Sequence, residues 1–181
     1  YNPLNRLAEA ELLPTLRRHG VAFVAYNPLA AGLLTGKHVK SGDVLPGRFK
    51  DNPNYLPRFY TDANFKALSS LQGACDTAGL NLLSATYSWL LQHSDLQAAR
   101  GDGLLLGASS LAQLEQNLEA CSQPVTLPEP VLSAFNGAWS IICGGGEEVF
   151  PYWRSYSKDQ PDRESLPPGA AYAAKKMDRH A

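Results

Sequence analysis

Apolar residues recur at helical spacing near the start of the chain and then give way to a continuous apolar run. Within residues 8–19, Leu12, Leu13 and Leu16 fall on one side of a helix, and Gly20 follows as a stop signal. Residues 21–26, Val-Ala-Phe-Val-Ala-Tyr, lack polar alternation, which is typical of a parallel strand buried on both faces. The pattern therefore predicts a helix followed directly by a buried strand.

Helical spacing returns three times further along the chain. One helix is predicted from Thr61 toward Gly79 and a second over residues 81–93. A third begins at the prolines 128 and 130 and ends at the glycines 144–146. Each of these segments carries an apolar stripe wide enough to pack against a sheet or another helix.

A second apolar run, Leu104-Leu105-Leu106, predicts another buried strand. It leads through Gly107-Ala108 into a helix that Ser109 and Ser110 are suited to cap. This alternation is typical of a βα array, so the fold class is α/β. We expect the two strands, over 22–26 and 103–106, to be adjacent and parallel. Two strands cannot close a sheet, so the pattern requires further strands.

Two segments lack such periodicity. Residues 36–60 are rich in Gly, Pro, Asn and charge, which predicts a long loop of the kind that is usually functional. Residues 155–181 hold little that can be buried, so we expect a mostly disordered tail after a domain that spans 1–154.

Composition excludes several classes of protein. The chain has 181 residues, 44% of them apolar, and a formal charge of −1, so it offers no basic surface for nucleic acid. No apolar run reaches the roughly 20 residues of a membrane span, and the start shows no signal peptide. Cys75, Cys121 and Cys143 lie far apart and the histidines have no metal-ligand spacing, which favours reduced thiols, no metal and a cytoplasmic location.

The start of the chain is also informative. The first residue is Tyr1 and the only methionine is Met177. A natural reading frame normally supplies an initiator methionine, so we expect the chain to be the back part of a longer protein.

Candidate chemistry lies in the loops that follow the two predicted strands. Tyr26 ends the first strand, where its ring can stack on a flat ligand. Small residues at 30–32 leave room for a pyrophosphate, and 35–37 (Thr-Gly-Lys) add donors and a positive charge. A core tyrosine followed by a simple turn would explain this segment equally well.

The loop after the second strand has related features. Gly107 and Ala108 allow close approach to the backbone, and Ser109 and Ser110 place hydroxyls and N–H groups at a helix N-terminus. Three amides then follow at one-turn spacing: Gln113, Gln116 and Asn117. An ordinary serine-capped helix is the alternative. The two loops in this order favour a phosphate-bearing cofactor.

Taken together, these segments resemble the C-terminal half of an aldo-keto reductase, in the branch that reduces aflatoxin aldehyde and succinic semialdehyde. The matching residues are Tyr26-Asn27-Pro28-Leu29-Ala30, Gly32-Leu33-Leu34-Thr35-Gly36-Lys37, Gly47-Arg48-Phe49, Leu106-Gly107-Ala108-Ser109-Ser110, Gln113 to Leu118, and Ala134-Phe135-Asn136 with Ala138-Trp139. The resemblance implies the last two strands, with their helices, of a (β/α)8 barrel that binds NADP(H).

By this resemblance, Tyr26 stacks on the nicotinamide and Arg48 closes over the cofactor. The pyrophosphate is wrapped by Asn27, Pro28, Leu29, Ala30, Ala31, Gly32, Leu33, Leu34, Thr35 and Gly36. The adenosine end is held by Gly107, Ala108, Ser109, Ser110, Gln113, Gln116 and Asn117. Many relatives carry Lys or Arg where this chain has Gly107 and Gln113, which leaves the choice between NADP and NAD open.

The resemblance also implies a substrate pocket for a small aldehyde or ketone. Tyr55 and Arg58 match its loop positions and Arg154 matches a terminal arginine, and an arginine fork can hold a carboxylate. The family's catalytic Asp, Tyr, Lys and His lie outside this chain, so Tyr26 is not the general acid and the isolated chain should be inactive. A homodimer is possible for the complete protein. The alternatives are a potassium-channel β-subunit-like interaction protein and a truncated, non-catalytic protein.

Overall fold

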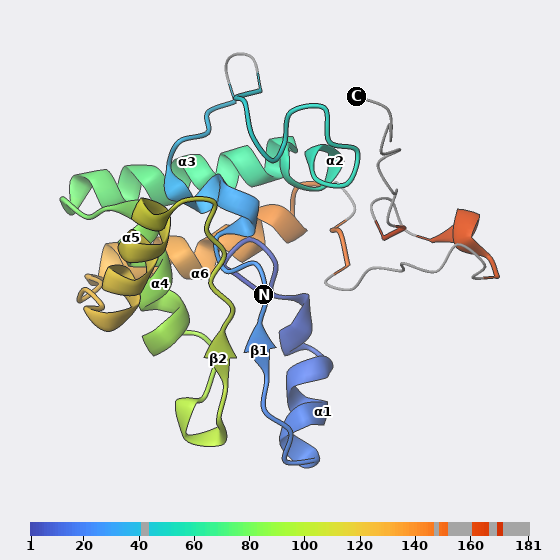
Figure 1. Ribbon diagram of the computed structural model, residues 1–181, viewed down its shortest axis with the longest axis horizontal. Helices are drawn as coiled ribbons and strands as arrows, with labels where there is room; N and C mark the ends of the chain where they lie inside the picture. The colour runs from blue at the N-terminus through green and yellow to red at the C-terminus, as the bar shows by residue number, and fades with distance from the viewer. Residues whose placement is uncertain (41–43, 147–148, 152–160, 167–169, 172–181) are drawn as a thin grey trace.

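The computed structural model describes residues 1–40, 44–146, 149–151, 161–166 and 170–171 (Figure 1). It contains a two-stranded sheet in which β1 (Val24–Ala25) and β2 (Gly103–Leu104) are parallel. Val24 is paired with Gly103 and Ala25 with Leu104, and the amide of Leu105 extends the ladder by donating to the carbonyl of Ala25 (3.0 Å). The prediction of two adjacent parallel strands is confirmed, although both strands are shorter than predicted.

The expectation that these strands are buried on both faces was wrong. Ala25 is fully buried against the helices, but Val24 is 58% exposed and Leu105 54% exposed. The reason is that alternate residues point to opposite faces of a sheet, and only one face is covered within the described residues. A second layer or neighbouring strands would be needed to bury the other face.

The helix predicted over 8–19 is also shorter than expected. A turn of 3-10 helix, η1 (Leu7–Glu9), comes first and α1 covers Leu12–Arg18. Pro14 explains the break, because it has no N–H to donate to the carbonyl four residues earlier. The residue is tolerated in the first turn of α1, where that N–H has no helical partner.

The other predicted helices are confirmed, and Ser110 caps one of them as predicted. They are α3 (Asp62–Thr77), α4 (Leu82–Gln92), α5 (Leu111–Ser122) and α6 (Glu129–Cys143). Side chains of Thr61, Asn81 and Ser110 accept hydrogen bonds from the first-turn amides of α3, α4 and α5. Such side chains satisfy donors that the helix itself leaves unpaired. The helix signals in the sequence therefore located these elements well.

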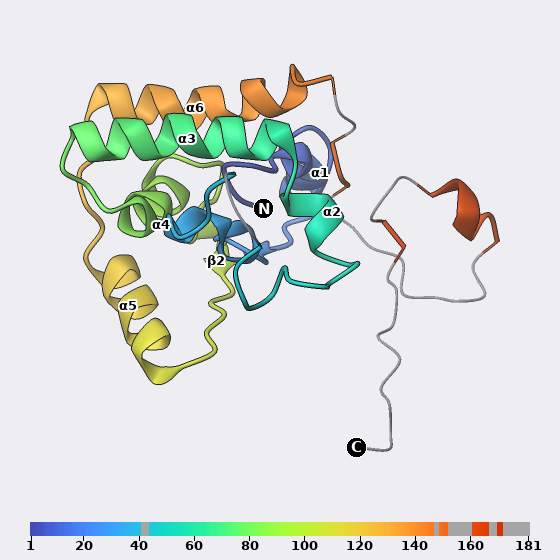
Figure 2. The same cartoon turned by 90° about the horizontal axis from the view of Figure 1, so that it is seen from above.

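The core lies between α3, α4, α6 and a kinked 3-10 segment, η2 (Ala30–Thr35). Figure 2 shows α3 and α6 side by side above the strands. Trp89 of α4 stacks on Phe135 of α6, with ring centroids 6.0 Å apart. Leu33, Leu34, Leu71, Trp89 and Phe135 are all fully buried. By contrast, α5 leaves leucine side chains such as Leu111 (71%) and Leu118 (51%) exposed.

The amino ends of the two strands are joined by one buried carboxylate. Asp102, which precedes β2, accepts hydrogen bonds from both terminal nitrogens of Arg17 and from the amides of Phe23 and Gln97 (2.8 Å each). Burial acts to raise the pKa of Asp102, but the bonds from Arg17, Gln97 and Phe23 outweigh it and hold the pKa below its usual value. This carboxylate therefore ties α1, β1 and β2 together.

Three shorter helices complete the described chain: α2 (Leu56–Phe59), η3 (Ala98–Arg100) and η4 (Arg163–Ser165). The described residues 36–40 and 44–60 thus form loop segments interrupted by α2. Most of residues 155–181 lie outside the described parts, so the disordered tail remains a prediction. None of the described helices is long and apolar enough to cross a membrane.

Candidate cofactor site

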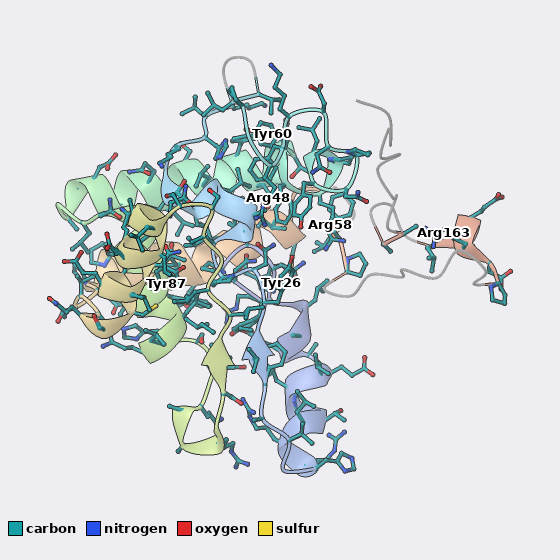
Figure 3. All side chains as sticks on the ribbon, viewed as in Figure 1. Tyr26, Arg48, Arg58, Tyr60, Tyr87 and Arg163 are labelled. Carbon is teal, nitrogen blue, oxygen red and sulfur yellow. The ribbon has the colours of Figure 1, made fainter. Side chains whose placement is uncertain are left out.

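The carboxyl end of β1 leads directly into an exposed tyrosine. Tyr26 is 59% exposed, and its hydroxyl lies 3.5 Å from that of Tyr55, which comes from the long loop. Figure 3 shows the Tyr26, Arg48 and Arg58 side chains gathered beyond this end of the sheet. The ring of Tyr26 therefore offers an accessible face, as stacking on a flat ligand requires.

The turn after Tyr26 has a left-handed backbone. Asn27, Ala30 and Ala31 have φ values of 63°, 48° and 59°. Non-glycine residues in this region cost on the order of 1–3 kcal/mol each and cluster at functional sites. Asn27 stabilises the turn, because its side-chain oxygen accepts a hydrogen bond from the amide of Ala31 (2.6 Å).

Two glycines in this turn have different surroundings. Gly32 has φ of 109°, and a Cβ placed there would meet nothing within 4 Å, so the space outside the turn is open for a ligand. Gly36 has φ of 77°, and a Cβ there would lie 2.8 Å from the side-chain oxygen of Gln72. Gly32 thus fits a cofactor cradle, whereas Gly36 is favoured by its left-handed backbone, since the flexible end of Gln72 can move away from a Cβ.

Several of the residues predicted in this turn direct their side chains elsewhere. Ala30, Leu33 and Leu34 are fully buried in the core, backbone included, so a ligand at the surface would not contact them directly. The Thr35 hydroxyl donates to the carbonyl of Gly32 (2.7 Å) and is used within the turn. Pro28 and Leu29 lie between Asn27 and η2.

In the second loop, two of the predicted amides hold the loop itself. Gln113 accepts hydrogen bonds from both the amide and the hydroxyl of Ser109 (2.9 Å each). Asn117 is only 3% exposed and donates to the carbonyl of Gly107 (3.1 Å). Gly107, Ala108, Ser109, Ser110, Gln113 and Gln116 are exposed. This loop is therefore held in place at the carboxyl end of β2 with its polar groups facing outward.

The long loop contributes an arginine and two aromatic rings. The guanidinium of Arg48 lies over the Tyr55 ring, 5.5 Å from its centroid. Tyr55 in turn stacks on Phe59 with centroids 6.0 Å apart and planes 17° apart. Our sequence analysis missed Phe59, although the density of aromatic residues between 49 and 60 could have indicated it. The structure thus brings Tyr26, Tyr55 and Arg48 together.

Of the two arginines predicted to bind substrate, the structure describes only Arg58. Arg58 donates from Nη2 to the carbonyl of Pro151 (2.9 Å), and its guanidinium lies 5.6 Å from the Phe150 ring centroid. Arg154 lies outside the described residues. The described parts of the chain contain no group of three or more His, Cys, Asp or Glu side chains that could hold a metal ion.

Known proteins are similar to this chain in sequence. The model of the aldo/keto reductase family matches residues 1–138. Mouse aflatoxin B1 aldehyde reductase member 2 is 45% identical over 152 residues, which cover 78% of this chain and 41% of the relative. Human aldo-keto reductase family 7 member A3 is 42% identical, with 78% and 46% covered. The chain thus spans less than half the length of these curated relatives.

Solved structures extend the likeness to the fold. The glycerol dehydrogenase AKR11B4 from Gluconobacter oxydans superimposes with a TM-score of 0.57 at 19% identity. The superposition covers 87% of this chain and 44% of the other. At this identity the likeness concerns the fold alone.

Proposed function

This chain belongs to the aldo/keto reductase family, and from that premise we propose that it is the cofactor-holding C-terminal part of a (β/α)8 barrel that reduces aldehydes with NADPH. The observation that carries the proposal is the exposed Tyr26 at the carboxyl end of β1, with Tyr55 and Arg48 beside it. In barrels of this type the loops at the carboxyl ends of the strands form the site. Family membership and geometry thus support the same surface.

Each part of the site has a role in this proposal. When bound, the nicotinamide supplies the hydride. Tyr26 would hold the nicotinamide ring against its exposed face. The accessible part of the left-handed turn 27–36, such as Ala31 and Gly32, would present backbone to the pyrophosphate, and Arg48 would cover it with positive charge. Loop 107–117 would hold the adenosine end, where Ser109 and Ser110 lie at the N-terminus of α5.

Proton transfer falls outside this chain in the proposal. The resemblance assigns it to a tyrosine that works with Asp, Lys and His in the first half of the barrel. The isolated chain would therefore bind cofactor weakly and reduce nothing. NADPH is proposed over NADH by likeness to the relatives, although Gly107 and Gln113 offer no positive charge for a 2′-phosphate.

A carboxylate-bearing aldehyde is the proposed substrate class. Arg58 and Arg154 are the proposed carboxylate ligands, and Tyr55 would line the same pocket. A guanidinium has five N–H donors, so the bond from Arg58 to Pro151 is compatible with such a role. Losing one charge-assisted pair typically costs about 1.5–3 kcal/mol, or roughly a 10- to 100-fold loss in kcat/KM.

A hybrid enzyme tests the proposal. The chain would be joined to the front half of mouse aflatoxin B1 aldehyde reductase member 2, and NADPH oxidation followed with succinic semialdehyde and with neutral benzaldehyde. We expect turnover by the hybrid and none by the isolated chain. Arg154→Ala should lose activity only toward the acid.

The same experiment separates the alternatives. A folded hybrid that binds NADPH without turnover would favour the interaction protein related to potassium-channel β-subunits. A hybrid that binds no NADPH would favour a non-catalytic protein. Equal losses on both substrates in Arg154→Ala would remove the carboxylate assignment. Arg18→Ala, far from the site on α1, is the matched control.

A further inference from the structure

Two polar residues close the long loop at its ends. Nδ1 of His38 lies 2.7 Å from the hydroxyl of Tyr60, although 22 positions separate them in the sequence. Arg48 and Tyr55 both lie between them. We call this hydrogen-bonded pair, His38 and Tyr60, the clasp.

The clasp is set in an aromatic cluster that is anchored on α3. Phe49 is 1% exposed, and the centroids of the His38 and Tyr60 rings each lie 5.0 Å from its own. Tyr60 meets Phe65 of α3 edge-on, also at 5.0 Å. Because α3 is a long and well-packed helix, the cluster fixes the clasp to a rigid element.

A short series of contacts links the clasp to the candidate site. Phe49 directly follows Arg48, and its ring lies 5.8 Å from that of Phe59. Phe59 stacks on Tyr55, and the guanidinium of Arg48 lies over the Tyr55 ring. Displacing Phe49 would therefore displace both Arg48 and the ring that supports it.

Both partners of the clasp are suited to a neutral hydrogen bond. Burial lowers the pKa of His38, and the charge of Lys37 lowers it further. Burial also raises the pKa of Tyr60. Near neutral pH the Tyr60 hydroxyl can thus donate a hydrogen bond to Nδ1 of an uncharged imidazole.

We propose that His38 and Tyr60 are positioning residues, whose hydrogen bond holds the loop so that Arg48 stays on Tyr55 beside Tyr26. The purpose of this arrangement, binding an anionic dinucleotide, rests on the proposed function above. The geometry of the clasp does not depend on the proposed function, and it can be measured without any ligand.

The experiment uses the full 181-residue chain and NMR. Tyr60→Phe keeps the ring and removes the hydroxyl, whereas His38→Leu removes the ring nitrogen. His38→Asn keeps a polar atom near the position of Nδ1 and serves as the rescue variant. His93→Leu, an exposed histidine at the end of α4, is the matched control.

The first measurement is amide exchange at Asn52, Tyr55 and Leu56, whose N–H groups donate within the loop. One hydrogen bond is worth about 1 kcal/mol, so Tyr60→Phe and His38→Leu should each speed exchange about fivefold and weaken the Arg48–Tyr55 contacts. In the double variant that combines Tyr60→Phe and His38→Leu, amide exchange should be no faster than in either single variant. His38→Asn and His93→Leu should match the wild type.

The second measurement is a titration with NADPH. About fivefold weaker binding by Tyr60→Phe, with wild-type binding by His38→Asn, would support the positioning role. Unchanged exchange in Tyr60→Phe would overturn the clasp, because aromatic packing would then hold the loop alone. Faster exchange with unchanged NADPH affinity would overturn the positioning role. If the wild type binds no NADPH while exchange responds as expected, the proposed function fails and the clasp stands.

Discussion

The two ends of the β1–β2 pair differ in what their polar groups do. At the amino end, the side chain of Asp102 is fully buried, and its hydrogen bonds are made to Arg17 and to backbone amides. At the carboxyl end, Tyr26 is 59% exposed and the turn after it has a left-handed backbone. The amino end is thus built around a buried carboxylate, whereas the carboxyl end presents an exposed aromatic ring and a strained turn.

This difference follows from what each end must do. A buried carboxylate is tolerated only when it is paired and hydrogen-bonded, and Asp102 meets both conditions. Backbone strain of the kind seen at Ala30 and Ala31 persists only where the surrounding structure enforces it. Here the enforcing structure is the core that buries Leu33 and Leu34 directly beneath the turn.

The largest effect is expected at the amino end. Asp102→Ala would leave Arg17, whose side chain is 16% exposed, without its carboxylate partner. We expect the free energy of unfolding to fall by about 3 kcal/mol, measured by urea denaturation. Asp62→Ala is the control, since Asp62 is 77% exposed in its pair with Lys40 and should cost less than about 1 kcal/mol. Equal losses of unfolding free energy in the two variants would mean that Asp102 does not hold β1 and β2 together.

Acid should reproduce part of this loss. The folded-state pKa of Asp102 lies below the ordinary value of 3.8, so its stabilising contribution is present above that value and is lost as the pH falls through the folded pKa. Denaturation curves collected between about pH 5 and pH 2 should show the decline. The decline should be shallower in Asp102→Asn, and an identical slope in that variant would contradict the assignment.

At the carboxyl end, the expected loss is in binding. Arg48→Ala should weaken NADPH binding about tenfold, as the loss of one charge-assisted contact of about 1.5 kcal/mol predicts. Its free energy of unfolding should change by less than about 0.5 kcal/mol, because Arg48 is exposed. Arg100→Ala, near the amino end of β2, should leave binding unchanged. If Arg48→Ala lowered the free energy of unfolding without weakening NADPH binding, Arg48 would hold the fold and would not bind the ligand, which would contradict the comparison.

The smallest effect is expected in the interior, away from both ends. Tyr87 is fully buried, and its hydroxyl has no hydrogen-bond partner within the described residues. Because Tyr87→Phe removes an unpaired polar group, thermal unfolding should show no loss of stability. Ser88→Ala is the contrast, since its hydroxyl accepts from the amide of Val125 (2.8 Å) and should cost about 1 kcal/mol. A large loss in Tyr87→Phe would show that the hydroxyl has a partner.

Local signals in the sequence were enough to find α3, α4, α5 and α6 and to place Tyr26 at the end of β1. Thr61, Asn81 and Ser110 cap helices as their residue types predict. Tyr26 was placed correctly at a strand end, because a short apolar run ending in a turn is a local pattern.

Contacts between distant segments could not be predicted. Arg17 and Asp102 are 85 positions apart, and nothing near either residue in the sequence indicates the other. The exposure of Val24 was missed because an apolar run does not tell how many layers cover it. The His38–Tyr60 bond was missed for a similar reason, since the intervening loop has no periodic pattern.

The most direct test of the account is an NMR titration of the full chain with NADPH, observed at every assigned amide. We expect shifts in the turn 26–36 and in the loop 107–117, with affinity weaker than about 1 μM because this chain forms only part of the proposed barrel. The amides near Arg17 and Asp102 should not respond. Shifts confined to that amino end, or none up to millimolar NADPH, would contradict the assignment of the carboxyl end as the cofactor site.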